Sequence, residues 1–241
     1  MKILITEQQI KQLVQAERVS FMLSESLSES KNFNALEKKI KTLLLSGVAL
    51  ASIISGINHM AISRNEKLEL IEKAKIEQEQ LVSQNKQDSI FNAKVSACRE
   101  YMEKALKNQG FNRNSTKLNP ESLVKKAEEQ GFDLPLLIAT AHYESCFGAT
   151  PRARKTNSVF SVGAYDSGKN MVKYAHPDDS IEGYINLLYN DYLTDDRTIN
   201  DLLKPGGFIN KNGHRYASKK NYEAVLKSIR NKIIAQYPEL T

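Results

Sequence analysis

The chain has 241 residues, of which 41% are hydrophobic and 26% are charged. This composition is typical of a folded protein and excludes wholesale disorder, collagen-like repeats and a protein with several membrane spans. The net charge of +6 suits an anionic partner such as cell wall or lipid headgroups. The basic residues do not concentrate in one arm, so we expect no nucleic-acid partner. Two cysteines are too few for a disulfide scaffold, and they lack the spacing of a metal site.

The first segment, residues 1–34, is expected to hold a short helix and a linker. Apolar residues recur near helical spacing over residues 4–24, and Thr6 with Gln9 resembles a capping box. Residues 24–34 are polar and rich in serine, which is typical of a linker. The sequence therefore predicts a short amphipathic helix at this end of the chain.

The second segment, residues 35–110, is expected to carry one apolar helix and a polar helical stalk. Thr42–Ile62 runs for 21 residues without a charge, close to the roughly 20 that a helix needs to cross a bilayer. Asn58 and His59 weaken this interpretation, and a buried hairpin or an interface helix is the alternative. Residues 63–107 contain no glycine or proline and favour a helical stalk.

The charges around the apolar stretch predict an orientation for the spanning alternative. Lys38, Lys39 and Lys41 precede Thr42–Ile62 closely, while the far side mixes basic and acidic residues. The lysine bias predicts that the N-terminus stays inside and that the C-terminal domain is exported.

The third segment, residues 111–241, is expected to form one compact domain. Pro120–Gln130 predicts a helix that ends at Gly131. Asp133 is expected to cap a second helix with the sequence LPLLIATAHYES.

A glutamate near the end of this second helix is a candidate general acid. Leu137, Ala141 and Glu144 follow at steps of four and three, so they share one helix face. Glu144 thus extends an apolar stripe at the negative end of the helix dipole. Partial desolvation and the dipole both raise the pKa of a carboxyl. A raised pKa is what a general acid needs to keep its proton near neutral pH.

Four motifs in the third segment carry a resemblance to a known family. They are AHYESCFG at 141–148, NSVFSV at 157–162, YAHPDDSIEGYINLL at 174–188 and YASKKNYEAVLKSI at 216–229. Their order and spacing resemble the glucosaminidase family of peptidoglycan hydrolases, glycoside hydrolase family 73. That family typically has a helix ending in E-S-x-x-G, an N-N-L-F-G-I turn, a tyrosine with an E-S-I-x-x-Y segment, and a late Y-A-x-x-x-x-Y.

The resemblance implies a mainly α-helical, lysozyme-like catalytic domain with a short β-hairpin. It also implies cleavage of the β-1,4 bond after N-acetylglucosamine, with Glu144 as general acid. The second carboxylate would lie on the hairpin, where Asp166 is the sole acid of GAYDSGKNMVK. Asp166 equally fits a turn residue. No metal and no organic cofactor is implied.

Four more residues are expected near the substrate by the same resemblance. Tyr174 and Tyr216 match family tyrosines near the cleft, although a packed core tyrosine fits each position as well. Asn157 and Phe160 are expected to shape the turn and the cleft wall. The chain departs from the family pattern where Ser158 and Ser161 replace the second asparagine and the glycine of N-N-L-F-G, and its hairpin is short.

Other functions stay open alongside the glucosaminidase. A lytic transglycosylase uses one glutamate on the same fold, although the G-L-M-Q-like segment that normally follows is missing. A non-catalytic wall-binding or structural virion protein is the second alternative. Catalysis by Cys146 with a histidine is disfavoured, and four scattered histidines lack a zinc-hydrolase pattern.

The expected setting is a cell envelope facing peptidoglycan, with the domain exported, or a phage virion. The expected partners are glycan strands of peptidoglycan, a membrane contacted through Thr42–Ile62, and virion or envelope proteins. A phage protein that opens the wall locally during DNA entry would fit this organisation, as would a bacterial remodelling enzyme.

Overall fold

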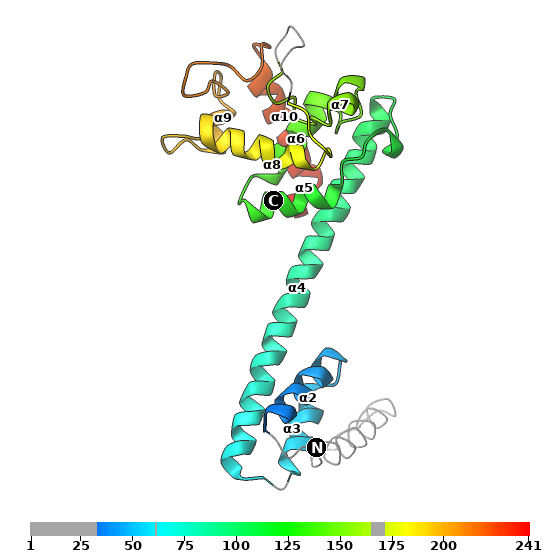
Figure 1. Ribbon diagram of the computed structural model, residues 1–241, viewed down its shortest axis with the longest axis vertical. Helices are drawn as coiled ribbons and strands as arrows, with labels where there is room; N and C mark the ends of the chain where they lie inside the picture. The colour runs from blue at the N-terminus through cyan, green and yellow to red at the C-terminus, as the bar shows by residue number, and fades with distance from the viewer. Residues whose placement is uncertain (1–32, 61, 165–171) are drawn as a thin grey trace, which may run out of the picture. The chain divides into compact units, whose positions relative to one another are not determined.

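The computed structural model of the protein describes residues 33–60, 62–164 and 172–241 (Figure 1). It is mainly helical, as the sequence predicts. The described residues fall into two compact units, with the division between residues 88 and 89. The amphipathic helix predicted over residues 4–24 lies outside the described residues.

The described part of the chain is built from helices of very different lengths. In chain order they are α2 (Phe33–Leu45), α3 (Leu50–Asn58), α4 (Arg64–Asn108), η1 (Arg113–Ser115), α5 (Pro120–Glu129), α6 (Leu134–Ser145), α7 (Pro151–Thr156), α8 (Asp179–Leu187), η2 (Leu188–Tyr192), α9 (Ile199–Leu202), α10 (Tyr222–Gln236) and η3 (Pro238–Leu240).

The prediction of one apolar helix over Thr42–Ile62 is wrong, because this stretch folds as parts of two helices. Helix α2 ends at Leu45 and α3 begins at Leu50. Between them Gly47 has a φ of +84°, a conformation that glycine adopts without steric cost and that stops a helix. The observed arrangement corresponds to the buried-hairpin alternative.

The first unit has a small apolar core that explains this arrangement. Its buried residues come from α2, α3, the turn after α3 and the start of α4: Leu36, Ile40, Leu44, Ile53, Ile57, Met60, Leu70 and Ala74. The spacing of four along α2 places its three members on one face. The apolar side chains therefore pack against one another.

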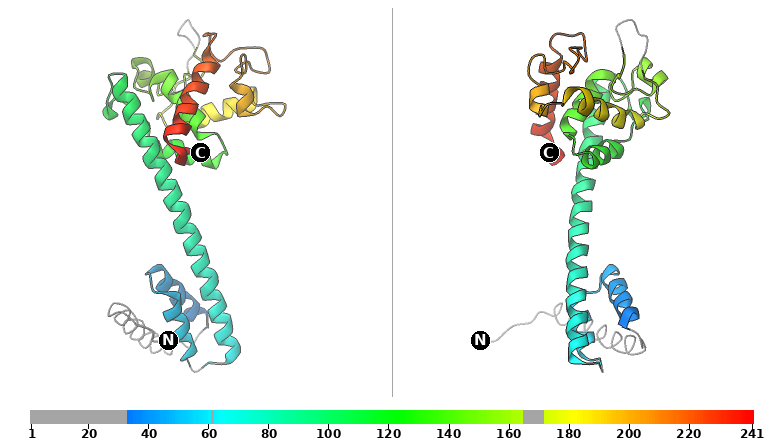
Figure 2. Two further views of the ribbon diagram at one scale, coloured as in Figure 1. Left: turned by 180° about the vertical axis from the view of Figure 1, so that it is seen from behind. Right: turned by 60° about the vertical axis from the view of Figure 1, so that its left-hand side comes forward.

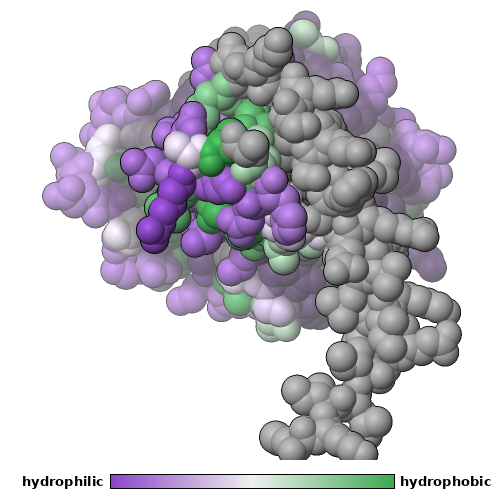
Figure 3. Space-filling model, turned by 90° about the horizontal axis from the view of Figure 1, so that it is seen from below, coloured by the Kyte–Doolittle hydropathy of each residue, from purple (hydrophilic) through white to green (hydrophobic). Residues whose placement is uncertain are grey.

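No helix in the described residues is both long and apolar enough to cross a membrane. On the face seen in Figure 3, hydrophilic residues predominate among those coloured, with small apolar patches between them.

Helix α4 is the polar helix predicted over residues 63–107. It has 45 residues, which corresponds to about 68 Å at 1.5 Å per residue. Its start is fixed by a reciprocal cap, because Ser63 N donates to Glu66 Oε2 at 2.9 Å and Glu66 N donates to Ser63 Oγ at 3.3 Å.

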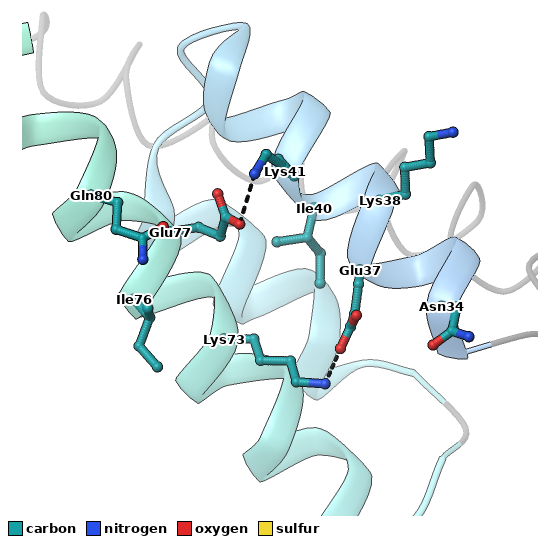
Figure 4. Close-up of a pocket in the computed structure, with 9 residues that line it drawn as sticks. All are labelled: Asn34, Glu37, Lys38, Ile40, Lys41, Lys73, Ile76, Glu77 and Gln80. Carbon is teal, nitrogen blue, oxygen red and sulfur yellow. Dashed lines mark hydrogen bonds and ion pairs between the residues drawn. The ribbon is translucent and has the colours of Figure 1, made fainter. Parts of the chain in front are cut away.

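A groove of about 400 Å³ lies between α2 and α4 in the first unit (Figure 4). Its two acidic residues are both paired with lysines. Lys41 Nζ lies 3.0 Å from Glu77 Oε1, and Lys73 pairs with Glu37. The charges that line the groove are thus largely neutralised within the fold.

Helix α6 is the central element of the second unit, and its first eight residues, 134–141, are buried. It packs against α5 and α10, and α6 lies beside α10 in both views of Figure 2. Asp133 caps α6, since Leu136 N donates to Asp133 Oδ1 at 2.7 Å. The same carboxylate accepts from Arg230 Nε of α10 at 2.9 Å. One residue therefore fixes both the start of α6 and its contact with α10.

The short β-hairpin of the sequence prediction is not supported. Within the described ranges the chain forms no β-strand, and Ile209 with Arg215 makes one isolated antiparallel bridge. Most of the segment expected to carry the hairpin, residues 165–171, lies outside the described residues.

Candidate active site

Glu144 lies at the C-terminal end of α6 and lines a cleft of about 380 Å³ in the second unit. The walls come from the end of α6, the start of α7, the turn after Phe160 and the segment that leads into α10. The lining residues are Tyr143, Glu144, Thr150, Arg152, Ala153, Ser161, Ala164, Tyr216, Ala217, Ser218, Lys219 and Tyr222. The cleft therefore joins three of the four motifs of the third segment.

The E-S-x-x-G motif forms a sharp turn that ends α6 at Ser145, the residue after Glu144. Cys146, Phe147 and Gly148 have φ values of 48°, 59° and 83°, which reverse the chain. Ser145 Oγ accepts from Gly148 N at 2.7 Å and donates to the carbonyl of Val159 at 2.6 Å. The serine thus holds the turn and the following loop together, and this fixes the end of the helix that carries Glu144.

The carboxyl of Glu144 has hydroxyl groups as its hydrogen-bond partners. Tyr222 Oη donates to Glu144 Oε1 at 2.7 Å. Burial raises the pKa of Glu144, while hydrogen bonds from Tyr222 and Ser161 and the charge of Lys219 act in the opposite direction. The balance is a raised pKa. Glu144 is therefore a half-buried carboxyl with an increased tendency to hold its proton.

Tyr222 is a buried donor that keeps its own proton. Burial, followed by the proximity of Glu144, raises its pKa well above the ordinary range of a phenol. The hydroxyl therefore stays protonated and donates to the carboxyl. Tyr222 is the second tyrosine of Y-A-x-x-x-x-Y, a position to which the motif alone assigned no role.

Ser161 occupies the position at which the family pattern has glycine. Its φ is +57°, a conformation that glycine adopts without steric cost. Ala164 N closes the turn by donating to the carbonyl of Ser161 at 3.0 Å. Ser161 therefore adopts a backbone conformation that glycine favours, and its side chain is hydrogen bonded to Glu144.

The two tyrosines predicted near the substrate lie in different places. Tyr216 lines the cleft, and its hydroxyl donates to the carbonyl of Phe160. Tyr174 is absent from the cleft lining and packs over Gly183 of α8, where a Cβ would come within 2.5 Å of its hydroxyl. Tyr216 and Glu144 thus line the same cleft, whereas Tyr174 packs against α8.

Asn157 and Phe160 hold the turn rather than line the cleft. Asn157 Nδ2 donates to the carbonyls of Tyr174 and Ala175, at 3.0 Å each. Phe160 is fully buried and stacks on Tyr184 with ring centroids 4.5 Å apart. Both side chains support the backbone that carries Ser161.

Glu144 is the one carboxylate among the described residues that line the cleft. Asp166, the predicted second carboxylate, lies outside the described residues. The lining also includes larger side chains that were not predicted from the sequence, among them Tyr143, Arg152 and Lys219. Tyr143 and Lys219 lie within two of the four motifs, which assigned them no role, and Arg152 lies outside all four.

Cys146 has the environment of a core thiol. It is buried, and desolvation raises its pKa to about 11, which disfavours the reactive thiolate. The nearby histidine in the same motif, His142, is hydrogen bonded through Nδ1 to Tyr101 Oη at 2.8 Å. Within the described ranges, no group of histidine, cysteine, aspartate and glutamate side chains is arranged to hold a metal ion.

Comparisons with protein-family models, curated proteins and solved structures gave no match for this chain. The functional assignment therefore depends on the geometry around Glu144 and on the sequence motifs that form the cleft.

Proposed function

We propose that the protein is a peptidoglycan hydrolase of the endo-β-N-acetylglucosaminidase type, with Glu144 as general acid. The observation that carries this proposal is a half-buried carboxyl of raised pKa in an open cleft, hydrogen bonded to a tyrosine. The cleft volume of about 380 Å³ falls in the range of about 300–1,000 Å³ that is usual for small-molecule sites.

In this mechanism Glu144 donates its proton to the oxygen of the scissile glycosidic bond. The bond between that oxygen and C1 then breaks, and C1 acquires oxocarbenium character. Tyr222 keeps the carboxyl oriented and stabilises the carboxylate that remains after proton transfer. Water completes the hydrolysis, and Asp166 is the residue proposed to activate it or to form a covalent intermediate.

A lytic transglycosylase is the second candidate. It is favoured by the single carboxylate in the described lining of the cleft, because that reaction uses one glutamate. Its product carries an anhydro-sugar end, whereas hydrolysis leaves a reducing end. Product chemistry therefore separates the two candidates directly.

Mass spectrometry of the products released from purified peptidoglycan tests the proposal. The full-length chain, Glu144→Gln and the matched control Glu129→Gln are compared. Glu129 is an exposed residue at the end of α5, outside the cleft lining. We expect fragments with N-acetylglucosamine at the new reducing end for wild type and control. Glu144→Gln should lower the rate about 10²- to 10⁴-fold, the usual contribution of a general acid.

Three other results would change the assignment. Anhydro-muramyl ends would indicate a lytic transglycosylase. Equal activity of wild type and Glu144→Gln would show that Glu144 is not the general acid. Binding to peptidoglycan without release of any fragment would indicate a wall-binding or structural module.

A further inference from the structure

We propose that the cleft binds a carboxylate on the glycan through Arg152 and Lys219, and so selects anionic strands over neutral ones. This inference rests on the proposed function and adds a substrate preference to it. The carboxylate has two sources in peptidoglycan: the lactyl group of a muramic acid without peptide, or the carboxylates of an attached peptide.

Arg152 and Lys219 reach the cleft from two different elements. Arg152 lies in α7, and Lys219 lies in the segment that precedes α10. Lys219 Nζ lies 5.2 Å from the ring centroid of Tyr143, which also lines the cleft. The aromatic face favours a cation at this position. Lys219 also acts electrostatically on Glu144, so its charge is close to the acid.

Arg152 and Lys219 are both exposed cations at the cleft. Among the described residues, Arg152 and Lys219 form no ion pair, and Glu144 is the one carboxylate in the lining. Glu144 has a raised pKa, which favours its neutral form. The described lining of the cleft therefore carries two positive charges and one carboxyl whose pKa is raised, and such a set of charges attracts anions.

The chemistry of these side chains fits a carboxylate. A guanidinium offers paired N–H donors that match the two oxygens of a carboxylate, and an ammonium supplies a point charge. A neutral polymer of N-acetylglucosamine has no group that would use these charges. It would offer neither cation an anionic partner.

The test compares kcat/KM of the full-length chain on three substrates: peptide-bearing strands, peptide-free strands with a free lactyl carboxyl, and neutral N-acetylglucosamine oligosaccharides. We expect the anionic strands to be preferred at least tenfold. Arg152→Met and Lys219→Met should each lower the ratio of anionic to neutral kcat/KM about tenfold, the loss of one charge-assisted hydrogen bond. Arg154→Met and Lys220→Met are the controls, since both residues are exposed neighbours outside the lining.

A parallel binding measurement makes the result independent of catalysis. Calorimetric titration with the same oligosaccharides should give tighter binding of the anionic forms, and binding should weaken as salt is added. The anionic form that gives the larger preference identifies the source of the carboxylate. Equal binding of anionic and neutral forms, or a ratio unchanged in both cleft variants, would overturn the inference. Cleavage of all three substrates at equal rates would also overturn the preference for anionic strands, but it would leave the proposed glycosidase function intact.

Discussion

The groove of the first unit and the cleft of the second have nearly the same volume, about 400 and about 380 Å³. In the groove, Glu37 and Glu77 each lie against a lysine (Figure 4). In the cleft, Glu144 is bound by a phenol, and two cations have no carboxylate partner among the described residues. The two sites therefore differ in how their charges are paired and not in their volume. Charges already paired within the fold are not available to a ligand.

A third carboxyl shows how strongly the partner decides the role. Glu223 directly follows Tyr222 in α10 and is also buried. Arg215 Nη2 lies 3.0 and 3.1 Å from its two carboxylate oxygens. Glu223 is thereby held in an ion pair with Arg215. Glu144, whose hydrogen bonds come from hydroxyl groups, is suited to exchange a proton.

The largest expected effect on stability concerns this ion pair, in which Glu223 is buried and the side chain of Arg215 is 35% exposed. Arg215→Met should lower the free energy of unfolding by about 3 kcal/mol, because a buried carboxylate loses its partner. Urea denaturation measures the change, with Arg154→Met as an exposed control expected within about 0.5 kcal/mol. The double variant Arg215→Met, Glu223→Gln should recover part of the loss. A loss below about 1 kcal/mol would contradict the structural role given to the pair.

A smaller effect is expected on catalysis when Tyr222 is changed to phenylalanine. The ring keeps its packing while Glu144 loses a hydrogen bond worth about 1 kcal/mol, so kcat/KM should fall about fivefold. That bond lowers the pKa of Glu144, so its removal raises the pKa further. The alkaline limb of the pH profile of kcat/KM should therefore move to higher pH. A shift to lower pH would show that Glu144 is not the group that limits activity there.

Glu144→Gln should stabilise the fold at neutral pH by about 1 kcal/mol, a usual gain when a strained functional group is removed. Folding raises the pKa of Glu144 above its ordinary value of 4.5. The folded chain therefore binds this proton more tightly than the unfolded chain does. That contribution is fully present below the unfolded pKa and is lost as pH rises through the folded pKa.

The pH dependence of the stability difference provides the check. Thermal or urea unfolding of wild type and Glu144→Gln should give nearly equal free energies near pH 3 and a more stable variant at pH 7. A difference that does not depend on pH would show that the carboxyl titrates alike in the folded and unfolded chains.

The smallest effect is expected in the groove of the first unit. Lys41→Met removes the ion pair with Glu77, whose side chains are 56% and 33% exposed. Such exposed pairs contribute about 0.5 kcal/mol or less to the free energy of unfolding. A loss above about 1.5 kcal/mol in urea denaturation would show that the groove depends on its charges as strongly as the Glu223 pair does.

The sequence by itself determined those elements whose signals are local. Asp133 before LPLLIATAHYES predicted the start of α6, and the structure confirms the cap. The steps from Leu137 to Glu144 placed the glutamate at the end of a largely buried helix, where burial raises its pKa. Caps and helical periodicity act over a few residues, so they can be read from the chain directly.

Only the tertiary structure decided which side chains meet Glu144. Tyr222 is 78 residues away from Glu144 in sequence. The family pattern alone did not show that Tyr216 lines the cleft while Tyr174 packs against α8. The same holds for Thr42–Ile62, where composition fits a membrane span and a buried hairpin equally well. The burial of Ile53 and Ile57 with residues of α2 and α4 depends on contacts between segments far apart in sequence, and local patterns carry no information about such contacts.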